Sequence, residues 1–143
     1  MENGITFGTL TSTNGTYEGE ILDGKPHGKG KYVFSSGGVY EGEWQNGRRH
    51  GLGVYIYSDG GRYEGEFKNG RRDGRGVYST PGGGKYEGEF KNDRYEGYGV
   101  FTWSTGETHE GMWGNGKPNG YGIYTFKSGG TLKGEWKNGR RVL

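Results

Sequence analysis

The chain has no cysteine, only three prolines and few aliphatic side chains. Without cysteine it can form neither a disulfide framework nor a cysteine-ligated metal site. Hydrophobic residues make up 27% of its 143 residues and the mean hydropathy is -1.04, so it lacks the apolar side chains that fill a two-layer sandwich. No signal peptide or membrane-spanning run is visible, which favours a cytoplasmic location.

A strong net charge and the usual catalytic patterns are missing as well. The net charge of +2 is too small to indicate nucleic-acid binding. The three histidines are scattered, and Gly28-Lys29-Gly30-Lys31 has neither the Ser/Thr nor the spacing of a phosphate-binding loop. Paired glutamates recur along the chain, as solvated strand residues do. We therefore expect no enzyme activity, no metal site and no cofactor.

Glycine and aromatic residues are abundant, and they recur with a fixed period of 23 residues. The sequence contains 35 glycines, and aromatic residues make up 15% of it. Successive repeats begin at Tyr17, Tyr40, Tyr63, Tyr86 and His109, and a half repeat begins at Leu132. Such a period indicates stacked supersecondary units. We divide the chain into an N-terminal capping half-repeat (1–16), five full repeats (17–131) and a C-terminal half-repeat (132–143).

Each repeat predicts one β-hairpin. In repeat 2, residues 40–44 alternate in polarity and Asn46-Gly47 follows, after which residues 51–57 alternate again. Asn-Gly is the strongest short-range hairpin signal, because a type I′ turn needs positive φ at both central residues. The same place holds Asp23-Gly24, Asn69-Gly70, Asn115-Gly116 and Asn138-Gly139, whereas repeat 4 has Asn92-Asp93.

The turn also predicts a register. A two-residue turn at 46–47 pairs Trp44 with Arg49, and it places Tyr40 opposite Gly53 and Gly42 opposite Gly51. The connection to the next repeat must hold an odd number of residues to keep the rings on one face, and Asp59-Gly60-Gly61 supplies three. The remaining predicted pairs are Tyr55 with Gly65, Gly53 with Phe67, and Tyr57 with Tyr63.

This pattern predicts the fold. Most strand glycines would lie across from a ring, and their bare backbone should let the sheet bend toward the aromatic face. We predict an all-β fold, a single elongated, twisted and curled antiparallel sheet of about twelve strands, which forms a half-pipe. Its concave side should carry Tyr17, Tyr40, Trp44, Tyr63, Phe67, Tyr86, Phe90, Trp113 and Trp136.

The motif YEGEWxNGxxHGxGxYxYxDGG resembles the MORN repeat (membrane occupation and recognition nexus), and the resemblance covers residues 17–143. It implies a non-catalytic scaffold that holds partner peptides in a groove. In some members it also implies attachment to membranes or the cytoskeleton, and acidic-lipid binding has been proposed. Repeat 5 departs from the motif with His109 for tyrosine and Met112 for glutamate, and repeat 1 with Ile21 for the aromatic residue.

The concave aromatic row is the first candidate site. A row of rings with no second layer above it is an apolar surface of the kind that binds partners, so we interpret the nine concave residues as a groove for a protein or peptide segment. The alternative interpretation is structural, with each ring packed on its glycine and nothing else. The two interpretations are compatible.

A basic edge is the second candidate site, and it predicts a membrane-targeting module that binds anionic lipid headgroups. The two-residue turns all project from one side of the sheet. They align Lys25, Arg48, Arg49, Lys68, Arg71, Arg72, Lys91, Arg94, Lys117, Lys137, Arg140 and Arg141. A structural alternative is that Arg49, Arg72 and Arg141 stack on the aromatic ring at position 5 of a repeat.

The C-terminal half-repeat stops just after its turn and leaves an open sheet edge. Either the natural chain continues beyond Leu143, or this edge pairs with another molecule, for example in a homodimer. A further alternative follows from the first case, in which the repeats are a regulatory segment of a larger enzyme.

Overall fold

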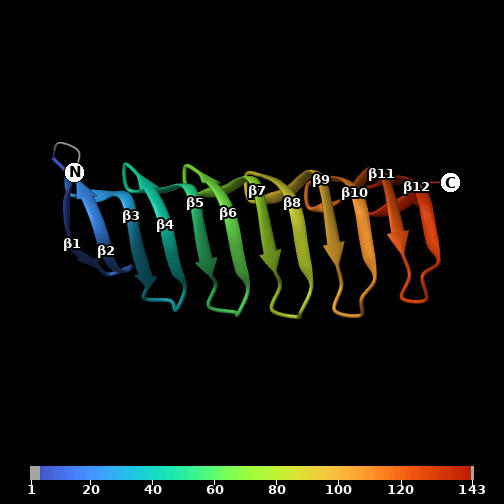
Figure 1. The fold of residues 1–143 in the computed structure, drawn as a ribbon, viewed down its shortest axis with the longest axis horizontal. Coiled ribbons are helices and arrows are strands. Elements are labelled where there is room, and N and C mark those ends of the chain that lie inside the picture. The colour runs from blue at the N-terminus through green and yellow to red at the C-terminus, as the bar shows by residue number, and fades with distance from the viewer. Residues whose placement is uncertain (1–3, 143) are drawn as a thin grey trace. The chain divides into compact units, whose positions relative to one another are not determined.

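The computed structural model describes residues 4–142, which form thirteen β-strands and no helix. Accordingly, no helix in that range is a candidate for crossing a membrane. The chain divides into two compact units, with unit 1 ending at Arg71 and unit 2 beginning at Arg72. Each unit is an open sheet of antiparallel strands that lie in chain order, which confirms the predicted fold class (Figure 1).

Unit 1 begins with a strand that precedes the first full repeat and pairs along its whole length with the next strand. Two hairpins and the first strand of a third follow. Its strands are β1 (Thr6–Ser12), β2 (Gly15–Leu22), β3 (Lys25–Phe34), β4 (Val39–Gln45), β5 (Arg48–Ile56) and β6 (Arg62–Lys68).

Unit 2 repeats the same construction and ends on a short strand that pairs only with the strand before it. Its strands are β7 (Arg71–Ser79), β8 (Lys85–Lys91), β9 (Arg94–Thr102), β10 (Thr108–Gly114), β11 (Lys117–Thr125), β12 (Thr131–Lys137) and β13 (Arg140–Val142).

The two-residue turns have the predicted backbone conformation. Asn46 and Gly47 have φ of 51° and 81°, as a type I′ turn requires, and the equivalent pairs of the other repeats match them. The exceptional pair Asn92-Asp93 adopts the same turn, with φ of 69° at Asp93. From repeat 2 onward, each turn is also tied to the repeat before it. In unit 1, the Gly70 backbone N–H donates to the Arg49 carbonyl.

A three-residue loop connects successive hairpins, as predicted, but it begins one residue earlier than expected. The backbone N–H of Tyr57 donates to the Gly61 carbonyl and that of Gly60 to the Tyr57 carbonyl, so the loop is residues 58–60. Gly60 has φ of +94°, the positive value that such a loop needs. Because three is odd, the aromatic side chains stay on one face, as predicted.

The predicted pairing within the hairpin is wrong beyond the first few residues. Trp44 does lie opposite Arg49, but Gly42 lies opposite Gly53 and Tyr40 opposite Tyr55. A β-bulge explains the difference, because Glu43 alone spans residues 50–52 of the partner strand. Two extra residues shift the pairing but preserve the faces.

The pairing between hairpins also differs from the prediction, because the three-residue loop begins one residue earlier. Gly51 lies opposite Phe67, Gly53 opposite Gly65 and Tyr55 opposite Tyr63. Gly51 has φ of +85° and supplies the backbone conformation of the bulge. The bulge recurs in the hairpins β2–β3, β8–β9 and β10–β11. Because a bulge bends its strand, the curvature of the sheet does not come from bare glycine alone.

The rings nevertheless lie on glycine, diagonally rather than directly across the strands. A Cβ added at Gly53 would be 2.5 Å from Cζ of Tyr40, so the ring occupies the space that a side chain would need. The Tyr40 hydroxyl donates a 2.8 Å hydrogen bond to the Glu43 carbonyl. Tyr17, Tyr63 and Tyr86 make the same hydrogen bond in their repeats. Burial raises the pKa of Tyr40 and that of Tyr86, and it raises the pKa of Tyr17 to about 12.

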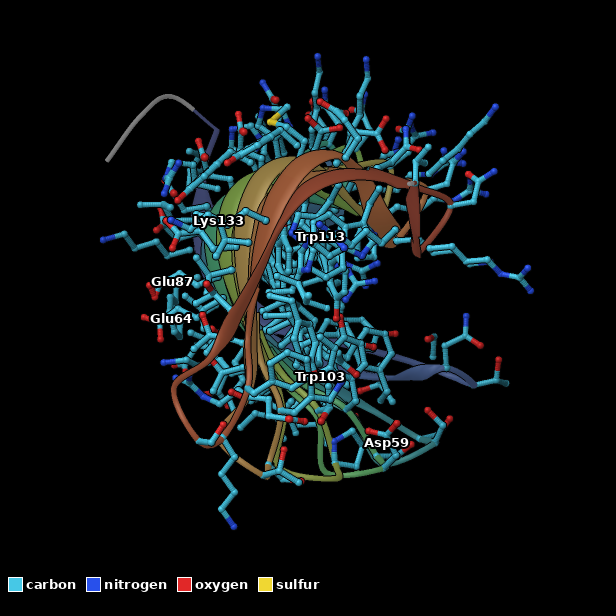
Figure 2. The ribbon with its side chains drawn as sticks, turned by 90° about the vertical axis from the view of Figure 1, so that its right-hand side faces the viewer. Asp59, Glu64, Glu87, Trp103, Trp113 and Lys133 are labelled. Carbon is cyan, nitrogen blue, oxygen red and sulfur yellow. The ribbon has the colours of Figure 1, made fainter. Side chains whose placement is uncertain are left out.

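The two faces of the curved sheet differ in character (Figure 2). In unit 2, Trp103 and Trp113 point to the concave side, whereas Glu87 and Lys133 point outward. In unit 1, Glu64 points outward and Asp59 lies in a three-residue loop. Alternation along each strand therefore separates aromatic from charged side chains, with the aromatic core on the concave side.

Candidate interaction surface

The nine residues predicted to line the groove all lie on the concave side, but they are buried. Their exposed fractions run from 0% to 8%, so they form the core of the sheet rather than a contact surface. Trp44 also donates its indole N–H to the Gly30 carbonyl at 3.0 Å, and Trp113 donates to the Gly99 carbonyl in the same way. Their structural role is therefore established, and a partner would meet other side chains first.

A second row of rings lies beside the buried rings on the same face and remains accessible. In unit 1 it consists of Tyr32, Phe34, Tyr55 and Tyr57, all half-buried. The ring centroids are 4.5 Å apart for Tyr32 and Phe34, 5.5 Å for Phe34 and Tyr55, and 4.4 Å for Tyr55 and Tyr57. These rings form a continuous ladder along the ends of β3 and β5.

Unit 2 has an equivalent ladder. Phe101, Trp103, Tyr124 and Phe126 follow one another with centroid separations of 4.8, 5.5 and 5.1 Å. Trp103 is 36% exposed and Phe126 39%. Sequence reasoning did not select these residues, although they recur at positions 16 and 18 of the repeat. Their place on the same face as the position-14 glycine was the signal that could have found them.

A hollow of about 390 Å³ opens on the concave side of unit 1 beside this ladder. Arg49 lines it together with Asn14, Tyr32, Phe34, Ser35, Ser36, Trp44 and Gly47. The Arg49 guanidinium carbon lies 5.2 Å from the ring centroid of Tyr55 and 5.8 Å from that of Phe67. Phe67 is the position-5 ring of the following repeat, so the predicted cation–π stacking occurs, but with a neighbouring repeat.

The equivalent arginine of unit 2 is neutralised within the fold. Nε of Arg72 lies 3.3 Å from Oδ1 of Asp93, and its guanidinium carbon lies 5.4 Å from the Phe90 centroid. In repeat 4, Tyr95 occupies the position equivalent to Arg49 and Arg72. Its ring stacks on Tyr86 with a centroid separation of 3.9 Å, and burial raises its pKa to about 12. Arg141, which was predicted to stack on a ring, instead donates a hydrogen bond to the Lys133 carbonyl at 2.9 Å.

The basic edge is present in each unit, without Arg49 and Arg72, which turn toward rings. The other ten predicted cations are exposed. In unit 1 they are Lys25, Arg48, Lys68 and Arg71; in unit 2 they are Lys91, Arg94, Lys117, Lys137, Arg140 and Arg141. Arg94 donates to Oδ1 of Asn115 at 3.1 Å.

A larger hollow, about 610 Å³, lies on unit 1 away from the aromatic core. Phe7 and Leu52 mark it with exposed fractions of 68% and 63%, but the rest of its lining is glycine and charged side chains of both signs. Charges of alternating sign on an open strand face are well solvated. This hollow lies on the charged face of the sheet, away from the ladder of rings.

Repeat 5 lacks two hydrogen bonds that other repeats contain. His109, 1% exposed, replaces the buried tyrosine, and its Nε2 has no hydrogen-bond partner within the described residues. Burial lowers the pKa of His109. Met112 replaces the glutamate that elsewhere accepts from a bulge N–H, as Glu89 does from Tyr98 at 2.6 Å. The two departures from the motif are thus structural, and both lie in one repeat.

No cluster of histidine and carboxylate side chains able to hold a metal ion occurs between residues 4 and 142.

A comparison with curated proteins finds no match. Among solved structures, the chain is similar to the TCP domain of SAS-4 from Drosophila melanogaster, solved in complex with a proline-rich motif of Ana2. The identity is 11%, the TM-score is 0.42, and the match covers 91% of this chain and 90% of that one.

Comparison with protein families gives a match along most of the chain. The MORN repeat model matches residues 17–39, 40–62, 63–85, 86–108, 109–131 and 133–142. These matches have the same 23-residue period as the hairpins of the structure. The chain therefore belongs to the MORN-repeat family.

Proposed function

We propose that this chain is a non-catalytic protein-interaction scaffold that binds a segment of a partner protein on the concave face of unit 1. The observation that carries the proposal is the ladder of half-buried rings formed by Tyr32, Phe34, Tyr55 and Tyr57, beside a hollow of about 390 Å³. Membership of the MORN-repeat family supports a scaffold role in general.

The physical argument rests on the kind of surface that these rings make. Aromatic side chains offer a large contact area at low cost in conformational entropy, and they are enriched where proteins bind one another. Buried rings contact the ladder and hold it in place: the ring centroids are 6.0 Å apart for Trp44 and Tyr32, and 6.2 Å apart for Tyr40 and Tyr55. The surface is therefore preorganised, which lowers the cost of binding.

The test requires a ligand that is selected rather than assumed. Random 16-residue peptides displayed on phage would be selected on the intact chain, and an enriched peptide would be labelled and titrated by fluorescence anisotropy. The combined substitutions Phe34→Ser and Tyr57→Ser should weaken its binding at least tenfold. Leu52→Ser, which removes an exposed side chain of the outer face, is the matched control and should leave affinity unchanged.

Circular dichroism must show that the double variant remains folded, because both rings are half-buried. A folded double variant that binds the selected peptide with unchanged affinity would contradict the proposal. So would a selection from which no peptide emerges that depends on Phe34 and Tyr57.

A membrane-targeting function is the second candidate, and the ten exposed cations of the basic edge favour it. Each cation near an anionic surface contributes about 1 kcal/mol. Sedimentation with phosphatidylglycerol vesicles should then exceed sedimentation with phosphatidylcholine vesicles, and the excess should fall as salt rises. Equal sedimentation with both vesicles would exclude this function.

A further inference from the structure

Arginines at equivalent positions of repeats 2 and 3 differ in one respect, the presence of a carboxylate. Arg72 has Asp93, whose Oδ1 lies 3.3 Å from Nε and also accepts from the Arg72 backbone N–H at 2.8 Å. Asp93 occupies the second position of its turn. Arg49 has Gly70 at the corresponding place, and therefore no carboxylate.

The hydrogen bonds of Arg49 are few for a guanidinium of five N–H groups. Its Nη2 donates to the Gly70 carbonyl at 2.6 Å. Its Nε is buried and finds no acceptor within residues 4–142. An unsatisfied, partly desolvated cation of this kind is costly unless an anion joins it.

The guanidinium is also held in one place. Its central carbon lies 5.2 Å from the ring centroid of Tyr55, 5.9 Å from that of Tyr40 and 5.8 Å from that of Phe67. The arginine therefore lines the hollow as a fixed donor beside Tyr32 and Phe34, not as a mobile surface charge.

Exposed cations outnumber carboxylates along the two-residue turns of unit 1. Lys25, Arg48, Lys68 and Arg71 are exposed along the two-residue turns of unit 1, where Asp23 is the acidic residue among the turn pairs. The outer face takes the strand carboxylates, such as Glu64 (Figure 2). A cationic rim attracts an acidic segment over a distance of about one Debye length and lowers the affinity of a basic one.

We infer that the partner segment carries an aspartate or glutamate that pairs with Arg49, next to an apolar side chain that lies against Tyr32 and Phe34. This inference rests on the proposed function and adds the chemistry of the partner. A carboxylate matches the planar fork of a guanidinium, and the charge-assisted pair forms where the surroundings are already apolar. Repeat 3 makes the same kind of pair internally, between Arg72 and Asp93.

The test gives Arg49 a carboxylate at the place where Arg72 has Asp93. Gly70→Asp creates the turn sequence Asn-Asp, which the chain tolerates at Asn92-Asp93. A Cβ at Gly70 would lie 3.8 Å from Nη2 of Arg49, so the new carboxylate has room to pair with it. Gly24→Asp is the matched control, because it adds the same charge to a turn of the same unit where a Cβ would meet nothing within 4 Å.

Peptides selected on the unsubstituted chain should be enriched in aspartate or glutamate at a fixed distance from an apolar residue. Gly70→Asp should weaken their binding about tenfold, and Gly24→Asp less than twofold. Replacing the acidic residue of the peptide by its amide should have the same effect as Gly70→Asp, and the two changes together should add little more. The amide peptide needs no protein variant, so it keeps the test valid if Gly70→Asp unfolds the chain.

Three results would overturn the inference. Peptides that depend on Phe34 and Tyr57 but bind Gly70→Asp and Gly24→Asp equally would remove the carboxylate partner and leave the scaffold function intact. Absence of any peptide that depends on those rings would remove both. Phosphatidylglycerol vesicles serve as the lipid arm, and sedimentation that Gly70→Asp alone abolishes would assign Arg49 to a phosphate and also overturn the inference.

Discussion

Glu43 accepts a 2.6 Å hydrogen bond, through Oε1, from the backbone N–H of Leu52 on the opposite strand. Leu52 belongs to the bulge that shifts the register of the hairpin, so its N–H has left the regular ladder. Glu20 makes the equivalent bond to Lys29 at 3.1 Å and Glu89 to Tyr98 at 2.6 Å. The repeated glutamate that looks like a solvated strand residue in the sequence thus closes the bulge.

Replacing Glu43 by methionine should destabilise the chain by about 1 kcal/mol, because the Leu52 N–H loses a charged acceptor at a partly exposed site. Thermal unfolding followed by circular dichroism measures this as a lower midpoint. Glu41→Met is the control, since the Glu41 carboxylate lies on the same outer face and takes part in no hydrogen bond within the described residues. Equal losses for the two variants would contradict the role assigned to Glu43.

The reciprocal change, Met112→Glu, should stabilise repeat 5 by about 1 kcal/mol. No side chain of the described residues accepts the Tyr121 N–H, which corresponds to the Leu52 N–H of repeat 2, and a glutamate at 112 would supply the acceptor. Met112→Gln separates the two contributions, because it adds the acceptor without the charge. A midpoint that stays constant or falls in both variants would show that the bulge of repeat 5 needs no acceptor.

Acid should weaken the fold through His109. Burial lowers its pKa in the folded state, so the unfolded chain binds a proton more readily, with an ordinary value of about 6.5. The stability that neutral His109 contributes is therefore present above that value and is lost as the pH falls below it. The unfolding midpoint should drop between pH 7.5 and 5.5 by more in the unsubstituted chain than in His109→Tyr.

The same variant should be more stable at pH 7.5 as well. A tyrosine hydroxyl at 109 can reach the Met112 carbonyl, as the Tyr86 hydroxyl reaches the Glu89 carbonyl at 2.8 Å, and one such bond contributes about 1 kcal/mol. Identical pH profiles for the two proteins would mean that other groups carry the acid response.

Gly53→Ala should destabilise the chain by about 3 kcal/mol, because the new methyl group would displace the Tyr40 ring from its hydrogen bond as well as overpack the core. Gly82→Ala is the control, since a Cβ there meets nothing within 4 Å, and it should change stability by less than about 0.5 kcal/mol. Urea titrations of both variants compare them directly. A tolerated alanine at 53 would refute the packing of rings on glycine.

The repeat, the hairpins and the two faces were all predictable from sequence because they depend on local rules. Asn46-Gly47 needs positive φ at both positions, and a side-chain period of 2 assigns Tyr40 and Trp44 to one face without knowledge of the rest of the chain. The pairing beyond the turn was not predictable in the same way. A one-residue slip would move every side chain to the other face and would contradict the polarity pattern. The bulge at Gly51 adds two residues and keeps every side chain on its face, so the polarity pattern cannot reveal it.

The sequence by itself thus determined the period, the turn type and the ring-bearing face of this protein, since each follows from the conformational preferences of a few neighbouring residues. Tertiary structure decided which rings stay accessible. Tyr40 and Trp44 are buried because rings of neighbouring repeats, Phe67 and Tyr17, pack against them. Half-buried rings remain at Tyr32, Phe34, Tyr55 and Tyr57. It also decided that Arg49 lacks the carboxylate that Arg72 has, since residues 21 positions apart meet only when successive hairpins pair.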